Sequence, residues 1–312
     1  MKNITLFSIA FLACFSLALT GCSKKKGEEG KITIDGSSTV FPVSEAVAEE
    51  FGKGKKVKIT VGKSGTGGGM KKFCAGEIDI TGASRHMKDS EKELCAKNGV
   101  EYIELPVAYD GISIVVQKDS FINDLTTDEL KKLWAPESEG KVTKWNQIRS
   151  SFPDQEIKLF GPGTDSGTFD YFTKKIVGKE QASRGDYTSS EDDNSLVKGV
   201  LGQKGSLAYF GFAYYAENKD KLKAVAIKHK DGEAVLPSMA AIADGTYKPL
   251  SRPIFIYVSK KAAERSEVES IVKFYLGDGL GLAKDVGYIP LTEELAASAN
   301  KRFSDRVTGA TK

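Results

Sequence analysis

Three short turns in this chain combine glycine with Ser or Thr just before a helical pattern. They span residues 36–39, 64–69 and 165–168. The start of a helix carries unpaired backbone N–H groups and a partial positive charge. Glycine lets an anion approach these amides, and hydroxyl groups add further donors. Three such turns together could hold a tetrahedral oxyanion without a metal.

Each turn by itself carries little weight, because Ser or Thr before a helix is usually only an N-cap. Other phosphate or catalytic motifs fail on spacing. Residues 62–64 (Gly-Lys-Ser) match the end of a P-loop, but Val57 stands where its first glycine is required. Residues 65–70 lack the last glycine of a dinucleotide fingerprint. The repeated turns therefore favour anion binding over nucleotide chemistry.

The sequence contains few of the motifs that catalytic sites require. No Gly-x-Ser-x-Gly elbow occurs, and the only histidines, His86 and His229, lie in no context that suggests a triad. No Cys-x-x-Cys pair occurs either, which disfavours a zinc site. We therefore expect no enzymatic activity, no metal and no cofactor.

Strand and helix patterns alternate along the chain, which predicts an α/β fold. The expected strands are 31–34, 57–61, 79–81, 156–160 and 206–210, and the expected helices are 41–51, 70–75, 90–97, 127–134, 194–201 and 213–217. Two long extended segments, 102–116 and 249–258, lie far apart in the sequence. They suit a chain that crosses between two lobes and returns.

The first 22 residues predict an export signal rather than part of the fold. Lys2 is the only charge before an apolar run over residues 6–19, which closes with Leu-Thr-Gly-Cys at Cys22. This ending resembles a bacterial lipobox, in which the cysteine becomes the lipid-modified first residue of the mature chain. We expect residues 1–21 to be a lipoprotein signal peptide and 22–30 to be the lipidated Cys and a tether. The protein would then be extracytoplasmic and anchored to the cell membrane.

The remaining cysteines favour a disulfide. Cys14 leaves with the signal and Cys22 carries lipid, so only Cys74 and Cys95 are left. An exported chain with two leftover cysteines favours a structural bridge over reactive thiols.

Size and charge limit the function further. About 280 residues follow the tether, which is comfortable for two domains. The net charge is only +3 and the charges are mixed along the chain, so we expect no nucleic-acid partner. We also expect a monomer that touches the membrane through its lipid alone.

Over nearly the whole mature chain, the sequence resembles the PstS family, the substrate-binding proteins of bacterial phosphate ABC importers. The resembling segments are DGSSTVFP (35–42), GKSGTGGG (62–69), DITGASR (79–85), AYDGISIVV (108–116), KWNQI (144–148), GPGTDSGTFDYF (161–172), DYTSSEDDN (186–194) and LSRPIFIYV (250–258). The resemblance implies a two-lobed type II periplasmic-binding-protein fold, with a mixed β-sheet flanked by helices in each lobe. It also implies that the lobes close on inorganic phosphate and deliver it to a membrane ABC permease. We expect lobe one to comprise 31–107 plus 252–312, and lobe two 108–251.

The resemblance also implies which residues bind phosphate. They come from the three turns and a fourth loop: Ser38, the Thr39 backbone, Ser64, Ser84, Ser166, Gly167 and Thr168. Two positions depart from the family pattern. The family has an Asp after the Ser of the fourth loop, where this chain has Arg85, and an Arg shortly before the Ser-Gly-Thr turn, where residues 161–164 carry no cation.

These departures suggest an exchange of charges. Arg85 is a candidate to replace the missing guanidinium, with a bidentate fork for two phosphate oxygens. A carboxylate acceptor must then come from elsewhere, because it would accept a proton-borne hydrogen bond from phosphate and repel sulfate. Asp165 and Asp110 are the candidates. Simpler roles compete: Asp165 as a helix cap, Asp110 in a turn with Gly111, and Arg85 paired with a surface acid.

Other functions stay open at this stage. The cargo could instead be sulfate, molybdate or a phosphorylated small molecule. A secreted phosphatase on the same scaffold, or an adhesin or phosphate sensor that serves no permease, would share many of the same sequence features.

Overall fold

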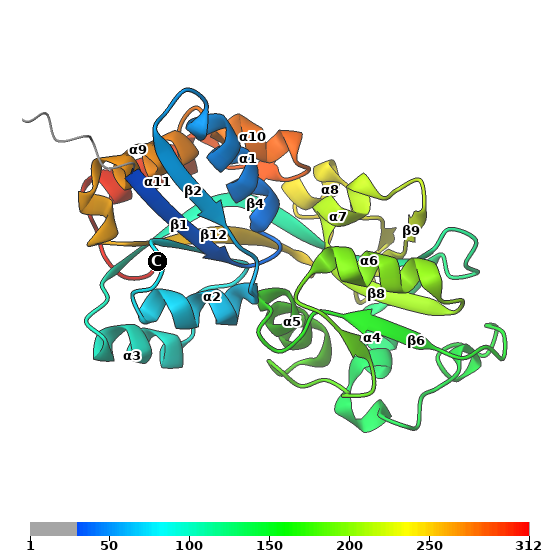
Figure 1. Ribbon diagram of the computed structural model, residues 1–312. Coiled ribbons are helices and arrows are strands. Elements are labelled where there is room, and N and C mark those ends of the chain that lie inside the picture. The colour runs from blue at the N-terminus through cyan, green and yellow to red at the C-terminus, as the bar shows by residue number, and fades with distance from the viewer. Residues whose placement is uncertain (1–29, 312) are drawn as a thin grey trace, which may run out of the picture.

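The computed structural model describes residues 30–311, which form two α/β lobes lying side by side (Figure 1). One lobe contains both the blue N-terminal part and the orange-to-red C-terminal part, and the other contains the green and yellow middle of the chain. Strands β4 (Tyr102–Gln117) and β12 (Ser251–Ser259) pair antiparallel and run between the lobes. The predicted two-lobed α/β fold and its two crossing segments are confirmed. The predicted signal peptide, Cys22 and the tether up to residue 29 lie outside the described residues.

The sheet of the first lobe has the strand order β2-β1-β3-β12-β4. Strand β1 (Gly30–Gly36) lies parallel to β2 (Val57–Val61) and β3 (Ile80–Ala83), whereas β12 is antiparallel to its neighbours. A short strand β13 (Ile289–Pro290) pairs with β4. The helices of this lobe are α1 (Phe41–Gly52), α2 (Gly65–Cys74), α3 (Asp89–Lys97), the 3₁₀ turn η4 (Ala262–Glu264), α9 (Ser266–Tyr275), α10 (Leu280–Asp285) and α11 (Glu293–Ser304).

The sheet continues into the second lobe in the order β4-β8-β6-β7. Its strands are β6 (Lys158–Gly161), β7 (Thr188–Ser189), β8 (Ser206–Gly211) and β9 (Leu222–Ala224), and a separate small sheet contains β5 (Asp124–Thr126), β10 (Ala226–Lys228) and β11 (Ala234–Val235). The helices are α4 (Thr127–Trp134), η1 (Pro136–Ser138), η2 (Trp145–Gln147), α5 (Gly167–Phe172) with its π-helical continuation η3 (Thr173–Val177), α6 (Asp193–Gly202), α7 (Phe212–Glu217) and α8 (Met239–Ala243).

Each lobe buries its own apolar core. In the first lobe, Phe51 of α1 and Phe303 of α11 belong to one cluster with Ile256 of β12. In the second lobe, Phe172 of α5 stacks on Tyr209 of β8 with ring centroids 3.9 Å apart. This packing fixes α5 on its sheet, and so it fixes the turn that precedes the helix.

The predicted disulfide is confirmed. Cys74 at the end of α2 is bonded to Cys95 in α3. Both cysteines are fully buried, and they lie in a small cluster with Phe73 and Met87. The bridge braces α3 against α2 within the first lobe.

Candidate functional site

The starts of three helices meet where the two lobes face each other. Two of these helices, α1 and α2, belong to lobe one, and the third, α5, belongs to lobe two. Thr39 and Thr168 share a hydrogen bond between their hydroxyl oxygens, which are 3.0 Å apart, across this boundary. The backbone N–H of Gly67 donates to the carbonyl oxygen of Asp165 at 2.7 Å. The three turns singled out in the sequence therefore do come together.

Two tyrosines form hydrogen bonds to the backbone of the first turn. The hydroxyl of Tyr214 donates to the carbonyl oxygen of Ser38 at 2.8 Å, and that of Tyr288 donates to the carbonyl oxygen of Thr39. The Ser38 hydroxyl in turn donates to the carboxylate of Asp193 at 3.2 Å. These bonds aim the side chains of Ser38 and Thr39 at the second lobe.

In the second turn, the buried hydroxyl is that of Thr66 rather than that of Ser64. The Ser64 hydroxyl donates to Asp35 within lobe one at 3.0 Å. Thr66 is fully buried, and its Oγ1 lies 3.3 Å from Oγ of Ser84. The difference arises because α2 starts at Gly65 and not at residue 70, so Thr66 lies in its first turn.

The third turn lies very close to lobe one. The Ser166 hydroxyl caps α5 by accepting from the backbone N–H of Thr168 at 3.1 Å. Gly167 faces lobe one so closely that a Cβ on it would lie 2.6 Å from the side-chain oxygens of both Thr66 and Ser84. Only glycine fits here in the closed arrangement.

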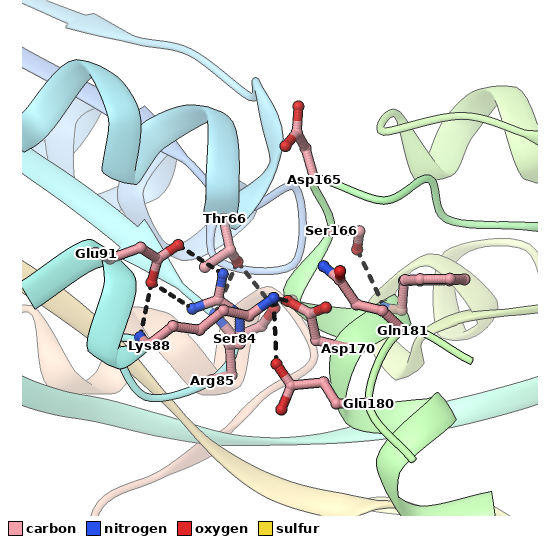
Figure 2. A network of polar contacts seen from close by, with 12 residues as sticks. Thr66, Ser84, Arg85, Lys88, Glu91, Asp165, Ser166, Asp170, Glu180 and Gln181 are labelled. Carbon is pink, nitrogen blue, oxygen red and sulfur yellow. Dashed lines mark hydrogen bonds and ion pairs between the residues drawn. The ribbon is translucent and has the colours of Figure 1, made fainter. Parts of the chain in front are cut away.

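Asp165 does not face this cluster of hydroxyls. Its carboxylate accepts from Nζ of Lys71 at 2.9 Å, and its side chain is 44% exposed. Figure 2 shows it pointing away from the other side chains. Ser166, not Asp165, is the cap of α5. The structure therefore places Asp165 in a surface ion pair between the lobes.

The guanidinium of Arg85 is already paired with carboxylates. Its Nε donates to Asp170 of lobe two at 2.6 Å, and its two terminal nitrogens donate to Glu91 at 2.8 Å each (Figure 2). Burial opposes the charged form, but Glu91 and Asp170 outweigh it and raise the pKa of Arg85. Of the roles considered from the sequence, pairing with acids is the one this geometry supports.

A different arginine lies among the hydroxyls. Arg252 of β12 is buried, and it donates to the carbonyl oxygen of Gly167 at 3.0 Å and to Oγ1 of Thr168 at 2.7 Å. One of its terminal nitrogens also lies 3.4 Å from Oδ2 of Asp110. Its Nε has no partner among residues 30–311. Burial lowers the pKa of Arg252, and the negative charge of Asp110 counters that effect.

The carboxyl group of Asp110 lies beside this arginine on the neighbouring crossing strand, β4. It is buried, and its Oδ1 has no partner in the described part of the chain. Burial raises the pKa of Asp110 to about 6, although Arg252 opposes the shift. A buried carboxyl with a free oxygen is suited to accept a hydrogen bond from a protonated oxyanion.

Comparison with known proteins places the chain in a family. The model of a PBP superfamily domain matches residues 23–276. Protein SphX of Synechococcus elongatus is 49% identical over 299 residues, which cover 96% of this chain and 88% of the relative. The phosphate-binding protein PstS of Staphylococcus saprophyticus is 36% identical over 316 residues, which cover 98% of this chain and 95% of the relative. The chain belongs to the PstS family of the PBP superfamily.

Solved structures agree with this assignment. A possible phosphate binding protein from Planctomyces limnophilus is 48% identical, with a TM-score of 0.64 over 89% of this chain and 99% of that one. A putative phosphate ABC transporter substrate-binding protein from Clostridium perfringens, solved with bound phosphate, is 27% identical, with a TM-score of 0.72 over 84% of this chain and 100% of that one. The type II periplasmic-binding-protein fold expected of a PstS-family chain is confirmed.

The donor set of this PstS-family protein suits a tetrahedral oxyanion. Hydroxyls and backbone amides arrive from both lobes, a guanidinium lies behind them, and a carboxyl group supplies an acceptor. Between residues 30 and 311, no group of three or more His, Cys, Asp or Glu could hold a metal ion. No helix in the same range is long and apolar enough to cross a membrane.

Proposed function

We propose that this protein binds inorganic phosphate between its lobes and delivers it to a membrane ABC permease. The observation that carries the proposal is the pairing of Arg252 with Asp110 amid hydroxyls contributed by both lobes. Relatives named as phosphate-binding proteins support the same cargo. These relatives are binding proteins, so the function proposed is capture and release without covalent chemistry.

The proposed phosphate contacts combine sequence and structure. They are Ser38, Thr39, Thr66, Ser84, Asp110, Ser166, Gly167, Thr168 and Arg252. Thr66 replaces Ser64, because the Ser64 hydroxyl is bonded to Asp35. Arg252 replaces Arg85 as the proposed cation, because Arg85 forms ion pairs with Glu91 and Asp170. Asp110 is kept as the proposed acceptor and Asp165 is not, because Asp165 forms an ion pair with Lys71.

Asp110 would distinguish phosphate from sulfate. A phosphate ion at neutral pH carries at least one proton and can donate a hydrogen bond to the free Oδ1 of Asp110. Sulfate has no proton, so its oxygens would meet a carboxylate lone pair. Arg252 supplies the attraction common to both anions.

Three features of the whole protein belong to the same proposal. Residues 31–107 with 252–312 and residues 108–251 form the lobes, and two apolar clusters, each drawn mainly from one of these parts, support this division. The protein is anchored outside the cytoplasm by lipid on Cys22. It acts as a monomer.

Titration calorimetry with phosphate, sulfate and molybdate tests the cargo. We expect tight phosphate binding and weak or absent sulfate binding by the natural protein. Asp110→Asn should narrow the preference for phosphate over sulfate by at least tenfold, since the lone pair that repels sulfate is replaced by a donor or a neutral acceptor. Tighter binding of sulfate or molybdate than of phosphate would overturn the proposal. Hydrolysis of p-nitrophenyl phosphate that survives repurification would favour the phosphatase alternative.

A further inference from the structure

A second buried carboxyl group lies beside Asp110. Asp193, the first residue of α6, is 1% exposed, and its Oδ1 accepts the hydrogen bond from Ser38. Its Oδ2 has no partner among the residues that the structure describes, and neither has Oδ1 of Asp110. A Cβ on Gly211 would lie 3.7 Å from each of these two oxygens. Both oxygens therefore lie close to Gly211 at the end of β8, where the backbone N–H groups of Gly211 and Phe212 favour the charged forms of Asp193 and Asp110 respectively.

Asp193 is not the N-cap of its helix. The N-cap of α6 is the preceding residue, Asp192, whose carboxylate accepts from the backbone N–H of Asn194 at 3.1 Å. Asp192 also forms an ion pair with Lys63 of lobe one at 3.1 Å. Capping and surface pairing are thus both assigned to Asp192, and they do not explain why Asp193 is buried.

The surroundings of Asp193 contain too little positive charge to neutralise both Asp193 and Asp110. From the elements packed around it, the ionisable groups are Asp110 on β4, Arg252 on β12, Tyr214 on α7 and Tyr288 before β13. Burial raises the pKa of both tyrosines, so they stay neutral. One guanidinium therefore faces two carboxyl groups. Burial raises the pKa of Asp193 to about 7 and that of Asp110 to about 6.

We propose that Asp193 is a second specificity-determining residue, which acts with Asp110 to select phosphate that carries two protons. The inference rests on the proposed function and deepens it. Each carboxyl group would accept from, or share a proton with, one protonated oxygen of the ion. Dibasic phosphate would bring its extra charge against a buried carboxylate and would be disfavoured. Binding above neutral pH would then draw a proton from solvent.

Calorimetry of the full chain with inorganic phosphate tests this proposal. Titrations at several pH values between 6 and 9, in buffers of different ionisation enthalpy, give the number of protons taken up on binding. For the natural protein we expect uptake of about one proton at alkaline pH and an affinity that falls about tenfold per pH unit there. Asp193→Asn should take up fewer protons, and its affinity should fall less steeply.

Asp192→Asn is the matched control, because it keeps an N-cap and changes a neighbouring carboxylate that faces Lys63. Its proton uptake and the slope of its affinity with pH should match those of the natural protein, whatever the loss of the ion pair with Lys63 does to the affinity itself. Asp193→Ser, checked by circular dichroism, serves if Asp193→Asn does not fold. Unchanged proton uptake and an unchanged slope in the Asp193 variants would overturn the inference. Failure of the proposed function would look different, because the natural protein would then give no heat with phosphate at any pH.

Discussion

The guanidinium of Arg85 in lobe one is bonded to the carboxylate of Asp170 in lobe two, with Nε and Oδ2 2.6 Å apart. Lys88 of lobe one reaches the same carboxylate at 2.8 Å, and it reaches Glu180 of lobe two at 3.2 Å. Figure 2 shows the two cations facing the two acids across the boundary between the lobes. These ion pairs stabilise the closed arrangement, and none of their four side chains is among the proposed phosphate contacts.

Arg85→Met should therefore weaken phosphate binding, although Arg85 is not a proposed phosphate contact. The pair with Asp170 is largely buried, with side chains 9% and 1% exposed, so its loss should cost about 1–3 kcal/mol of the closed state. Calorimetry should show about ten- to a hundredfold weaker binding, and small-angle scattering should show a more open average shape.

The matched control is Arg149→Met. Arg149 also pairs with two acids, Glu129 and Asp124, but all three residues lie in lobe two. This variant should keep the natural affinity. Equal affinities for the Arg85 and Arg149 variants would show that the pairs between the lobes do not contribute to closure.

Gly167→Ala should prevent full closure. Its added Cβ would lie 2.6 Å from side-chain oxygens of Thr66 and Ser84 in the opposite lobe, which is too close for any contact. The lobes would have to stay slightly apart, so we expect phosphate affinity to fall at least tenfold while the unfolding temperature changes little. Gly202→Ala is the control, since nothing lies within 4 Å of a Cβ at that position. Natural affinity in the Gly167 variant would contradict the tight approach seen here.

Most of the fold could be predicted, because its signals are local. The strands around residues 31–34 and 206–210 and the helix at 127–134 follow from apolar spacing and from a capping residue. The sequence predicts a start of α2 at residue 70, whereas the helix begins at Gly65, because the run of glycines at 67–69 is unfavourable for a helix when only local preference is considered. Close packing overrides that preference: a Cβ on Gly67 would lie 3.1 Å from Oδ1 of Asp165 in lobe two, and a Cβ on Gly69 would lie 2.5 Å from Cα of Gly36 within lobe one.

The site was only partly predictable for a different reason. The hydroxyl turns were found because each contains its own signal. Arg252 was missed, although it lies in the segment 250–258, because nothing local distinguishes a buried arginine from an exposed one. Its position depends on the pairing of β12 with β4, which sets Arg252 directly opposite Asp110. Such a contact joins residues 142 positions apart in the chain.

Arg252→Met should abolish tight phosphate binding. The variant removes the guanidinium from the cluster and leaves the carboxyl group of Asp110 buried without its cation. Breaking a buried pair in this way costs about 3–5 kcal/mol of stability, so thermal unfolding must be measured alongside calorimetry. Arg184→Met is a suitable control, because Arg184 is also buried but pairs with Asp186 within lobe two. The Arg184 variant should lose stability but keep its affinity for phosphate. If the Arg252 variant also kept its affinity, the proposed role of Arg252 would be contradicted.

Removing the disulfide should lower stability but not affinity. Cys74 and Cys95 are 21 positions apart, and the bridge joins α2 to α3 within lobe one. The double variant Cys74→Ser, Cys95→Ser should lose about 3 kcal/mol of unfolding free energy in urea titrations. The phosphate dissociation constant at 25 °C should stay within about twofold, since neither helix start that faces lobe two is altered. The natural protein in reducing agent should show the same loss, and an unchanged unfolding curve would contradict the prediction.

Glu191 should make the ligand-free protein less stable at alkaline pH. Burial, reinforced by the charge of Asp165, raises the pKa of Glu191 from its ordinary 4.5 to about 7. The folded state therefore holds a proton that the unfolded state has already released between these values. The stability that this proton provides is complete below about pH 4.5 and is lost as the pH rises through about 7. In urea titrations, Glu191→Gln should match the natural protein at low pH and exceed it at pH 8, whereas the exposed Glu217→Gln should change neither. A natural protein as stable as Glu191→Gln at pH 8 would show that the half-buried carboxyl ionises without cost.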